Sequence, residues 1–152
     1  MKSAFVLGII GSLFLMMGCS KDESSLLRKQ QYELKSVNNS GISGTVYVSE
    51  NLDSSFNITI VLNSSVKDTV HVMNVYNGTE SVQGNVAFKL VDIKGTGQSV
   101  IGETKDIGQF IANTGTYKTL TYDAIMDYDA VVKVLYSSSK DSAICIGKIG
   151  KF

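Results

Sequence analysis

One histidine and two cysteines are the side chains of this sequence best suited to bind a transition metal. A zinc or copper site needs three or four nitrogen, sulfur or carboxylate ligands. His71 has no carboxylate two residues away, and Cys145 lies in an apolar run. We therefore expect no bound metal or other cofactor, and we expect His71 to be a strand histidine with one ring nitrogen hydrogen-bonded.

The sequence offers little for acid–base or nucleophilic catalysis. It has no G-x-S-x-G elbow, and its single histidine lies in a predicted strand. Asp123 and Asp127 are explained by a short helical turn over 123–127 with Asp123 as its N-cap. Asp129 could join Asp127 at a calcium ion, which prefers oxygen ligands. We expect a protein that is not an enzyme. A metal-binding envelope protein (copper, zinc or calcium) and a hydrolase with an unrecognised site are the alternatives.

The N-terminal residues predict a different kind of chemistry, namely lipid attachment. Lys2 is followed by the apolar run 4–17, which has the length of a signal-peptide core and is too short to span a bilayer comfortably. The run ends in Leu15-Met16-Met17-Gly18-Cys19, which resembles the lipobox of bacterial lipoprotein signal peptides. Residues 1–18 are thus predicted to be a signal peptide cleaved between Gly18 and Cys19, and acyl chains on Cys19 would attach the mature protein to a membrane.

The residues after Cys19 predict where the protein resides. Ser20-Lys21-Asp22-Glu23 resembles an acidic signal that directs some lipoproteins to the cell surface. We expect a lipid anchor in the outer membrane with the domain exposed on the surface, and a periplasm-facing domain is the alternative. Residues 19–40 are polar and are predicted to be a flexible tether that could include a short helix around 24–34.

From residue 43 the hydrophobic pattern has a period of two, which is typical of half-buried strands. Short turn-forming segments separate these runs, among them Asn77-Gly78. The pattern predicts an all-β antiparallel sandwich of about seven or eight strands over residues 41–152, because a sheet face without helices must be covered by another sheet. The predicted strands are 45–48, 56–62, 69–76, 85–91, 109–112, 117–121, 131–136 and 143–149. Cys145, in the last of these, is expected to be buried and inert.

Composition limits the class of partner. The chain has 14 basic and 14 acidic residues and no net charge. This balance provides no basic surface for nucleic acid. A protein or glycan of the cell envelope is the expected partner, in addition to the membrane.

Three stretches of the predicted domain share their order and spacing with a known family. They are Ser43–Val46, Val70–Gly78, and Leu120–Ser137 followed by Ile144–Gly150. Together they resemble the CHRD domain, named from chordin. The resemblance implies an immunoglobulin-like or dismutase-like Greek-key sandwich.

The departures from the CHRD pattern concern its histidines. On the middle strand His71 is retained, whereas Asn74 and Tyr76 stand at the other two histidine positions. Leu135 replaces a later histidine, and Lys148 replaces a terminal aspartate. His71, Asn74, Tyr76 and Leu135 therefore mark a candidate vestigial ligand site that has lost most of its metal-binding groups.

Overall fold

A computed structural model describes residues 27–151 as an all-β fold, which confirms the predicted fold class. Eight strands form one curled antiparallel sheet in the order β6-β5-β11-β12-β1-β2-β3-β8. Two small sheets, β4-β7 and β9-β10, and the helix α1 complete the described part. The bounds are β1 Lys29–Ser36, β2 Gly44–Glu50, β3 Phe56–Leu62, β4 Val70–His71, β5 Met73–Gly78, β6 Gln83–Lys89, β7 Ile93–Lys94, β8 Val100–Ile107, β9 Gln109–Ile111, β10 Tyr117–Thr119, α1 Tyr122–Met126, β11 Asp129–Leu135 and β12 Ala143–Gly150.

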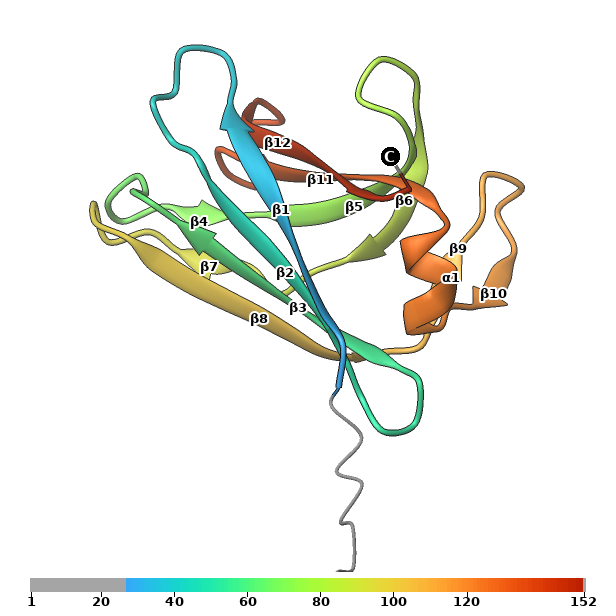
Figure 1. Ribbon diagram of the computed structural model, residues 1–152. Helices are drawn as coiled ribbons and strands as arrows, with labels where there is room; N and C mark the ends of the chain where they lie inside the picture. The colour runs from blue at the N-terminus through green and yellow to red at the C-terminus, as the bar shows by residue number, and fades with distance from the viewer. Residues whose placement is uncertain (1–26, 152) are drawn as a thin grey trace, which may run out of the picture.

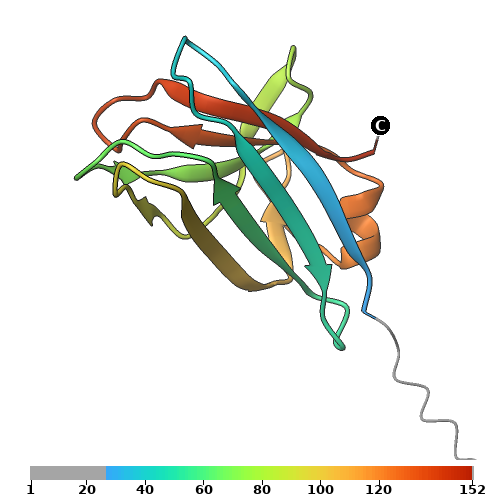
Figure 2. The same ribbon diagram turned by 60° about the vertical axis from the view of Figure 1, so that its left-hand side comes forward.

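Strand β1 belongs to both halves of the curled sheet (Figures 1 and 2). Residues 29–34 pair with β2, whereas Lys35 and Ser36 pair with β12. Gly147 of β12 lies at this crossing, and a Cβ there would press against the carbonyl oxygen of Glu33. The absence of a side chain thus lets β1 approach β12 and turn the sheet over on itself.

The two halves bury their apolar faces against each other. Alternate residues of β3 point inward and are at most 1% exposed, as the period of two predicted. They meet Met73 and Val75 of β5 and Val132 and Val134 of β11 in one hydrophobic core. Cys145 is fully buried in this core, and burial raises the pKa of its thiol to about 12, so the thiol stays protonated at neutral pH.

The predicted boundary between tether and domain is wrong. Residues 29–36 of the expected tether form β1, in the middle of the sheet, rather than flexible chain or helix. Only Tyr32 and Leu34 of this strand are buried. Because most of its residues are polar, the strand lacks the apolar alternation by which strands are predicted. Strand β8 was also not predicted, because its outward-facing residues are mostly exposed and Gly102 interrupts the run.

Two local predictions shift in register. The helix begins at Tyr122 and its N-cap is Thr121, whose hydroxyl accepts a hydrogen bond from the backbone N–H of Ala124 at 3.2 Å. Asn77 and Gly78 end β5 rather than forming the turn, and the hairpin closes with a hydrogen bond from Thr79 N–H to Val82 O at 2.9 Å.

Asn77 is instead a buried polar link between elements. Its Nδ2 donates to Asn85 Oδ1 at 2.6 Å and to the Ile111 carbonyl at 2.8 Å, and its Oδ1 accepts from the Tyr128 hydroxyl at 2.7 Å. The Asn77 side chain is fully buried. If it were removed, each of these partners would lose a hydrogen bond that water cannot easily replace.

Replacing Asn77 by Ala should therefore destabilise the fold by about 3 kcal/mol, since several buried polar groups lose their partner together. Equilibrium unfolding in urea would measure the change. Gln98→Ala is the matched control, because Gln98 is exposed. If Asn77→Ala cost no more than Gln98→Ala, Asn77 would have no such role.

Candidate functional site

His71 is a fully buried structural side chain. Its Nε2 accepts a hydrogen bond from the backbone N–H of Val66 at 3.1 Å. Its Nδ1 lies 2.9 Å from the carbonyl oxygen of Tyr136 and 3.2 Å from that of Leu135. This arrangement requires the neutral tautomer with the proton on Nδ1. Both ring nitrogens are hydrogen-bonded to backbone groups, whereas we expected only one to be. Neither nitrogen is therefore available to a metal or ligand.

The other members of the candidate vestigial site lie apart from the His71 ring. Asn74 and Tyr76 point to the face of β5 opposite the core residues Met73 and Val75, with Asn74 Nδ2 3.4 Å from the Tyr76 hydroxyl. Leu135 is 7% exposed, and its backbone carbonyl oxygen lies 3.2 Å from His71 Nδ1. The structure thus pairs Asn74 with Tyr76 and His71 with the Leu135 backbone, and it does not direct the four side chains into one cleft.

The aspartates near α1 have separate partners. Asp123 accepts a hydrogen bond from Arg28, and Asp129 lies 3.5 Å from the Lys148 ammonium. Within residues 27–151 no group of three or more His, Cys, Asp or Glu side chains is arranged to hold a metal ion. Gly18 and Cys19, the predicted cleavage and lipidation residues, lie outside the described residues.

A polar groove of about 580 Å³ lies between β1 and the loop that joins β5 to β6. In Figure 1 this loop rises beside β12, above and to the right of β1. We call this site the polar groove, and it is lined by Gln31, Tyr32, Glu33, Lys35, Thr79, Glu80, Ser81 and Lys148. Sequence reasoning missed it, because the groove combines the unpredicted strand β1 with a loop distant in sequence.

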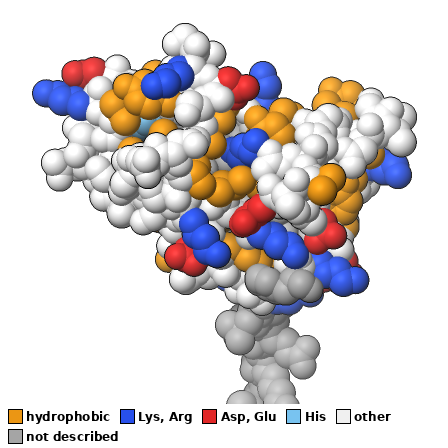
Figure 3. All heavy atoms as spheres, turned by 90° about the horizontal axis from the view of Figure 1, so that it is seen from above, with side chains coloured by type: hydrophobic (Ala, Val, Ile, Leu, Met, Phe, Trp, Pro, Cys, Tyr) orange, Lys and Arg blue, Asp and Glu red, His pale blue; other side chains and the backbone are white. Residues whose placement is uncertain are grey.

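Three of the four charged side chains that line the polar groove make no ion pair with another described residue. Lys148 pairs with Asp129, but Glu33, Lys35 and Glu80 make no ion pair within residues 27–151. The loop is ordered by its own hydrogen bonds, since the Thr79 hydroxyl accepts from the Val82 N–H at 3.2 Å and lies 3.2 Å from the Ser81 hydroxyl. The molecule viewed from above shows basic and acidic side chains mixed with apolar patches (Figure 3).

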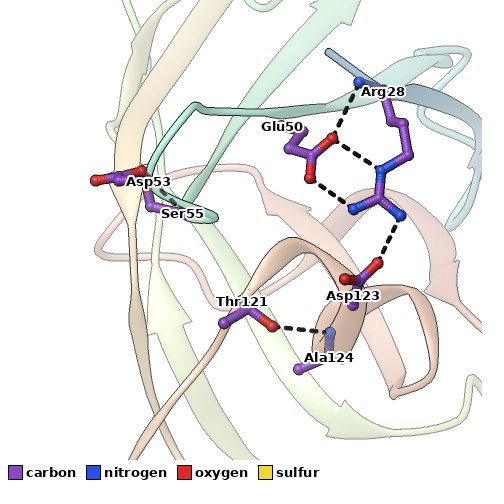
Figure 4. Close-up of polar contacts among 7 residues, drawn as sticks. All are labelled: Arg28, Glu50, Asp53, Ser55, Thr121, Asp123 and Ala124. Carbon is purple, nitrogen blue, oxygen red and sulfur yellow. Dashed lines mark hydrogen bonds and ion pairs between the residues drawn. The ribbon is translucent and has the colours of Figure 1, made fainter. Parts of the chain in front are cut away.

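A second polar cluster surrounds Arg28, the residue before β1 (Figure 4). Its guanidinium donates from Nε to Glu50 Oε2 at 2.8 Å, from Nη2 to Glu50 Oε1 at 2.6 Å, and from Nη1 to Asp123 Oδ1 at 2.6 Å. Arg28 Cζ also lies 4.7 Å from the centre of the Tyr122 ring. We call these contacts the Arg28 clasp, because they join the start of β1 to β2 and α1.

Comparisons with known proteins assign no function. No family model and no curated protein matches the chain. One solved structure is similar, a β-glucosidase, DesR, from Streptomyces venezuelae in complex with D-glucose, with a TM-score of 0.31 and 12% sequence identity. The match covers 81% of this chain, which spans only 15% of that chain, and a likeness this weak carries no argument. The resemblance to the CHRD domain therefore stays a prediction.

The described residues include no helix that is long and apolar enough to cross a bilayer.

The Arg28 clasp makes stability depend on pH. Hydrogen bonding to Arg28 lowers the pKa of Glu50 from its ordinary value of 4.5 to about 2. A carboxyl group with a lowered folded-state pKa stabilises the fold above its unfolded pKa, and this contribution disappears as pH falls through the folded value. The difference in Tm between the wild type and Glu50→Gln should be full at pH 6 and shrink as the pH falls from about 4.5 to about 2.

Thermal unfolding followed by circular dichroism would measure this difference. Arg28→Gln supplies the control, because Glu50→Gln made in that background should have little effect at any of these pH values. A Tm difference that is independent of pH in the wild-type background would contradict the clasp.

Proposed function

We propose that this protein is a lipid-anchored, non-enzymatic binding protein of the bacterial outer membrane, exposed on the cell surface. The observation that carries the proposal is the sequence Leu15–Cys19, with Gly18 directly before the cysteine. A cleaved, acylated Cys19 would become the first residue of the mature chain. The position of Arg28 supports this proposal, because only eight residues separate Cys19 from this side chain, which is hydrogen-bonded to the sheet.

The engagement of His71 supports a role other than catalysis. The only imidazole of the chain is hydrogen-bonded at both nitrogens by the backbone, so it is not placed to act as a general base or a metal ligand. The thiol of Cys145 is buried and protonated, which makes it a poor nucleophile.

The polar groove is the proposed ligand site, and an envelope glycan is its proposed ligand. Glu33, Lys35 and Glu80 offer charged hydrogen-bonding groups that have no ion partner within the described part of the chain. Sugar hydroxyls both donate and accept hydrogen bonds, so a glycan chain can satisfy carboxylates and ammonium groups together.

Lipid attachment is tested by growing cells with an alkyne-tagged fatty acid and detecting the tag on the purified protein. The wild type should carry the tag, whereas Cys19→Ser should lose it, because the thiol that receives lipid is gone. Cys145→Ser is the matched control and should keep the tag. A tag that survives Cys19→Ser, or a wild type without any tag, would refute the anchor.

Glycan binding is tested by NMR titration with soluble oligosaccharides released from the outer membrane of the producing cells. Amide shifts should concentrate on residues 31–35, 79–81 and 148. Lys35→Gln should weaken binding several-fold, because it removes a charged hydrogen-bond donor from the groove. Lys89→Gln changes a lysine of the same sheet outside the groove lining and should leave binding unchanged. Shifts on another surface, or none with this glycan fraction, would overturn the assignment.

A further inference from the structure

We propose that one end of the domain rests on the bilayer, with Leu52 entering the lipid headgroup region. This membrane-facing end consists of Leu27, Arg28 and the loop 51–55 between β2 and β3. The inference rests on the proposed function, because its occupant is the membrane that holds the acyl chains of Cys19.

The length of chain before the domain limits how far the domain can stand from the membrane. Nine residue steps separate Cys19 from Arg28. Whatever its conformation, this segment cannot reach further than about 30 Å. Strand β1 is about 25 Å long, so its far end lies about that far from the point where the chain enters the domain.

The Arg28 clasp determines which end is nearer. In addition to the side-chain bonds, Arg28 N–H donates to Glu50 Oε2 at 3.2 Å, and Glu50 N–H donates to the Arg28 carbonyl at 2.9 Å. Backbone and side chain of Arg28 are thus held beside the end of β2. Because β1 cannot easily separate from β2 at this point, the tether cannot lengthen, and the chain leaves the domain next to loop 51–55 (Figures 1 and 2).

Loop 51–55 is a rigid support for an exposed leucine. Asn51 N–H donates to Ser55 O at 2.9 Å, and Ser54 N–H donates to Asn51 O at 3.0 Å. Asp53 Oδ1 accepts from the Ser55 N–H and hydroxyl, at 3.0 and 2.6 Å. Leu52 is 85% exposed, the highest value among the exposed large apolar residues described, and Leu27 beside the clasp is 49% exposed. These two side chains give the membrane-facing end an apolar surface that water does not favour.

Charge does not drive this contact. Arg28 pairs with Glu50 and Asp123, and Asp53 of loop 51–55 adds a third carboxylate, which accepts hydrogen bonds from Ser55. A buried leucine side chain adds only a modest free energy to that of the acyl chains. Leu52 is therefore expected to orient a domain that the lipid already holds on the membrane, rather than to hold it there.

The test uses the mature, isotope-labelled lipoprotein extracted with its anchor and placed in lipid nanodiscs that contain a lipid with a paramagnetic headgroup. NMR relaxation of backbone amides reports the distance to that headgroup. Amides of residues 51–54 should relax several-fold faster than those around Val82, an apolar residue of the β5–β6 loop that is 74% exposed.

Three variants sharpen the test. Leu52→Asn should reduce the enhancement at its neighbours, whereas the matched change Val82→Asn should leave it unaltered. Arg28→Gln should make the relaxation rates of the two loops more similar, because the segment before β1 is no longer held beside β2. Equal enhancement at both loops of the wild type, or a larger one at Val82, would overturn the inference.

Mass spectrometry of the same sample separates this inference from the proposed function. An acylated Cys19 with the wrong relaxation pattern overturns only the orientation of the domain. A mature chain without acyl groups overturns the lipid anchor and, with it, the surface on which the domain was inferred to rest.

Discussion

Strand β1 forms hydrogen bonds with β2 along most of its length and with β12 at its end, and this shared pairing makes one curled sheet from two faces. Backbone N–H and C=O groups that are removed from water must be paired, so β1 cannot leave either neighbour without a large cost. The apolar faces of the two halves then have only each other to cover them. The hydrophobic core and the polar groove both follow from this one crossing.

Buried polar side chains specify how the smaller elements dock on this sheet. Asn77 connects β5 to β6 and β9 and to the Tyr128 hydroxyl, and His71 connects β4 to the segments around Val66 and Leu135. Each is fully buried, and each has its hydrogen-bonding groups satisfied by specific partners rather than by apolar contact. Such links favour a single arrangement of the chain, because a shifted strand would leave several polar atoms unpaired. The one histidine is thus accounted for by structure.

Strong alternation made most of the fold predictable. The run 56–62 is predicted as a strand and forms β3 with the same bounds, because its inward side chains are all large and apolar. Strands β11 and β12 are predicted within two residues for the same reason. Strand β1 is not predicted, since six of its eight residues are exposed and its stability comes from pairing on both sides rather than from its own apolar face. The polar groove is lined in part by β1, so it could not be predicted from the sequence.

The amino-acid sequence by itself determined the all-β class and the expectation of a lipid anchor, because period-two alternation and an apolar run ending at Cys19 are local patterns that need no partner to be recognised. Only the tertiary structure decided that residues 29–36 form a strand in the middle of the sheet, that both nitrogens of the His71 ring are hydrogen-bonded, and that β1 and the β5–β6 loop enclose a groove. These features depend on contacts between residues far apart in the chain. Such contacts form only when the sheet curls and brings its two halves together.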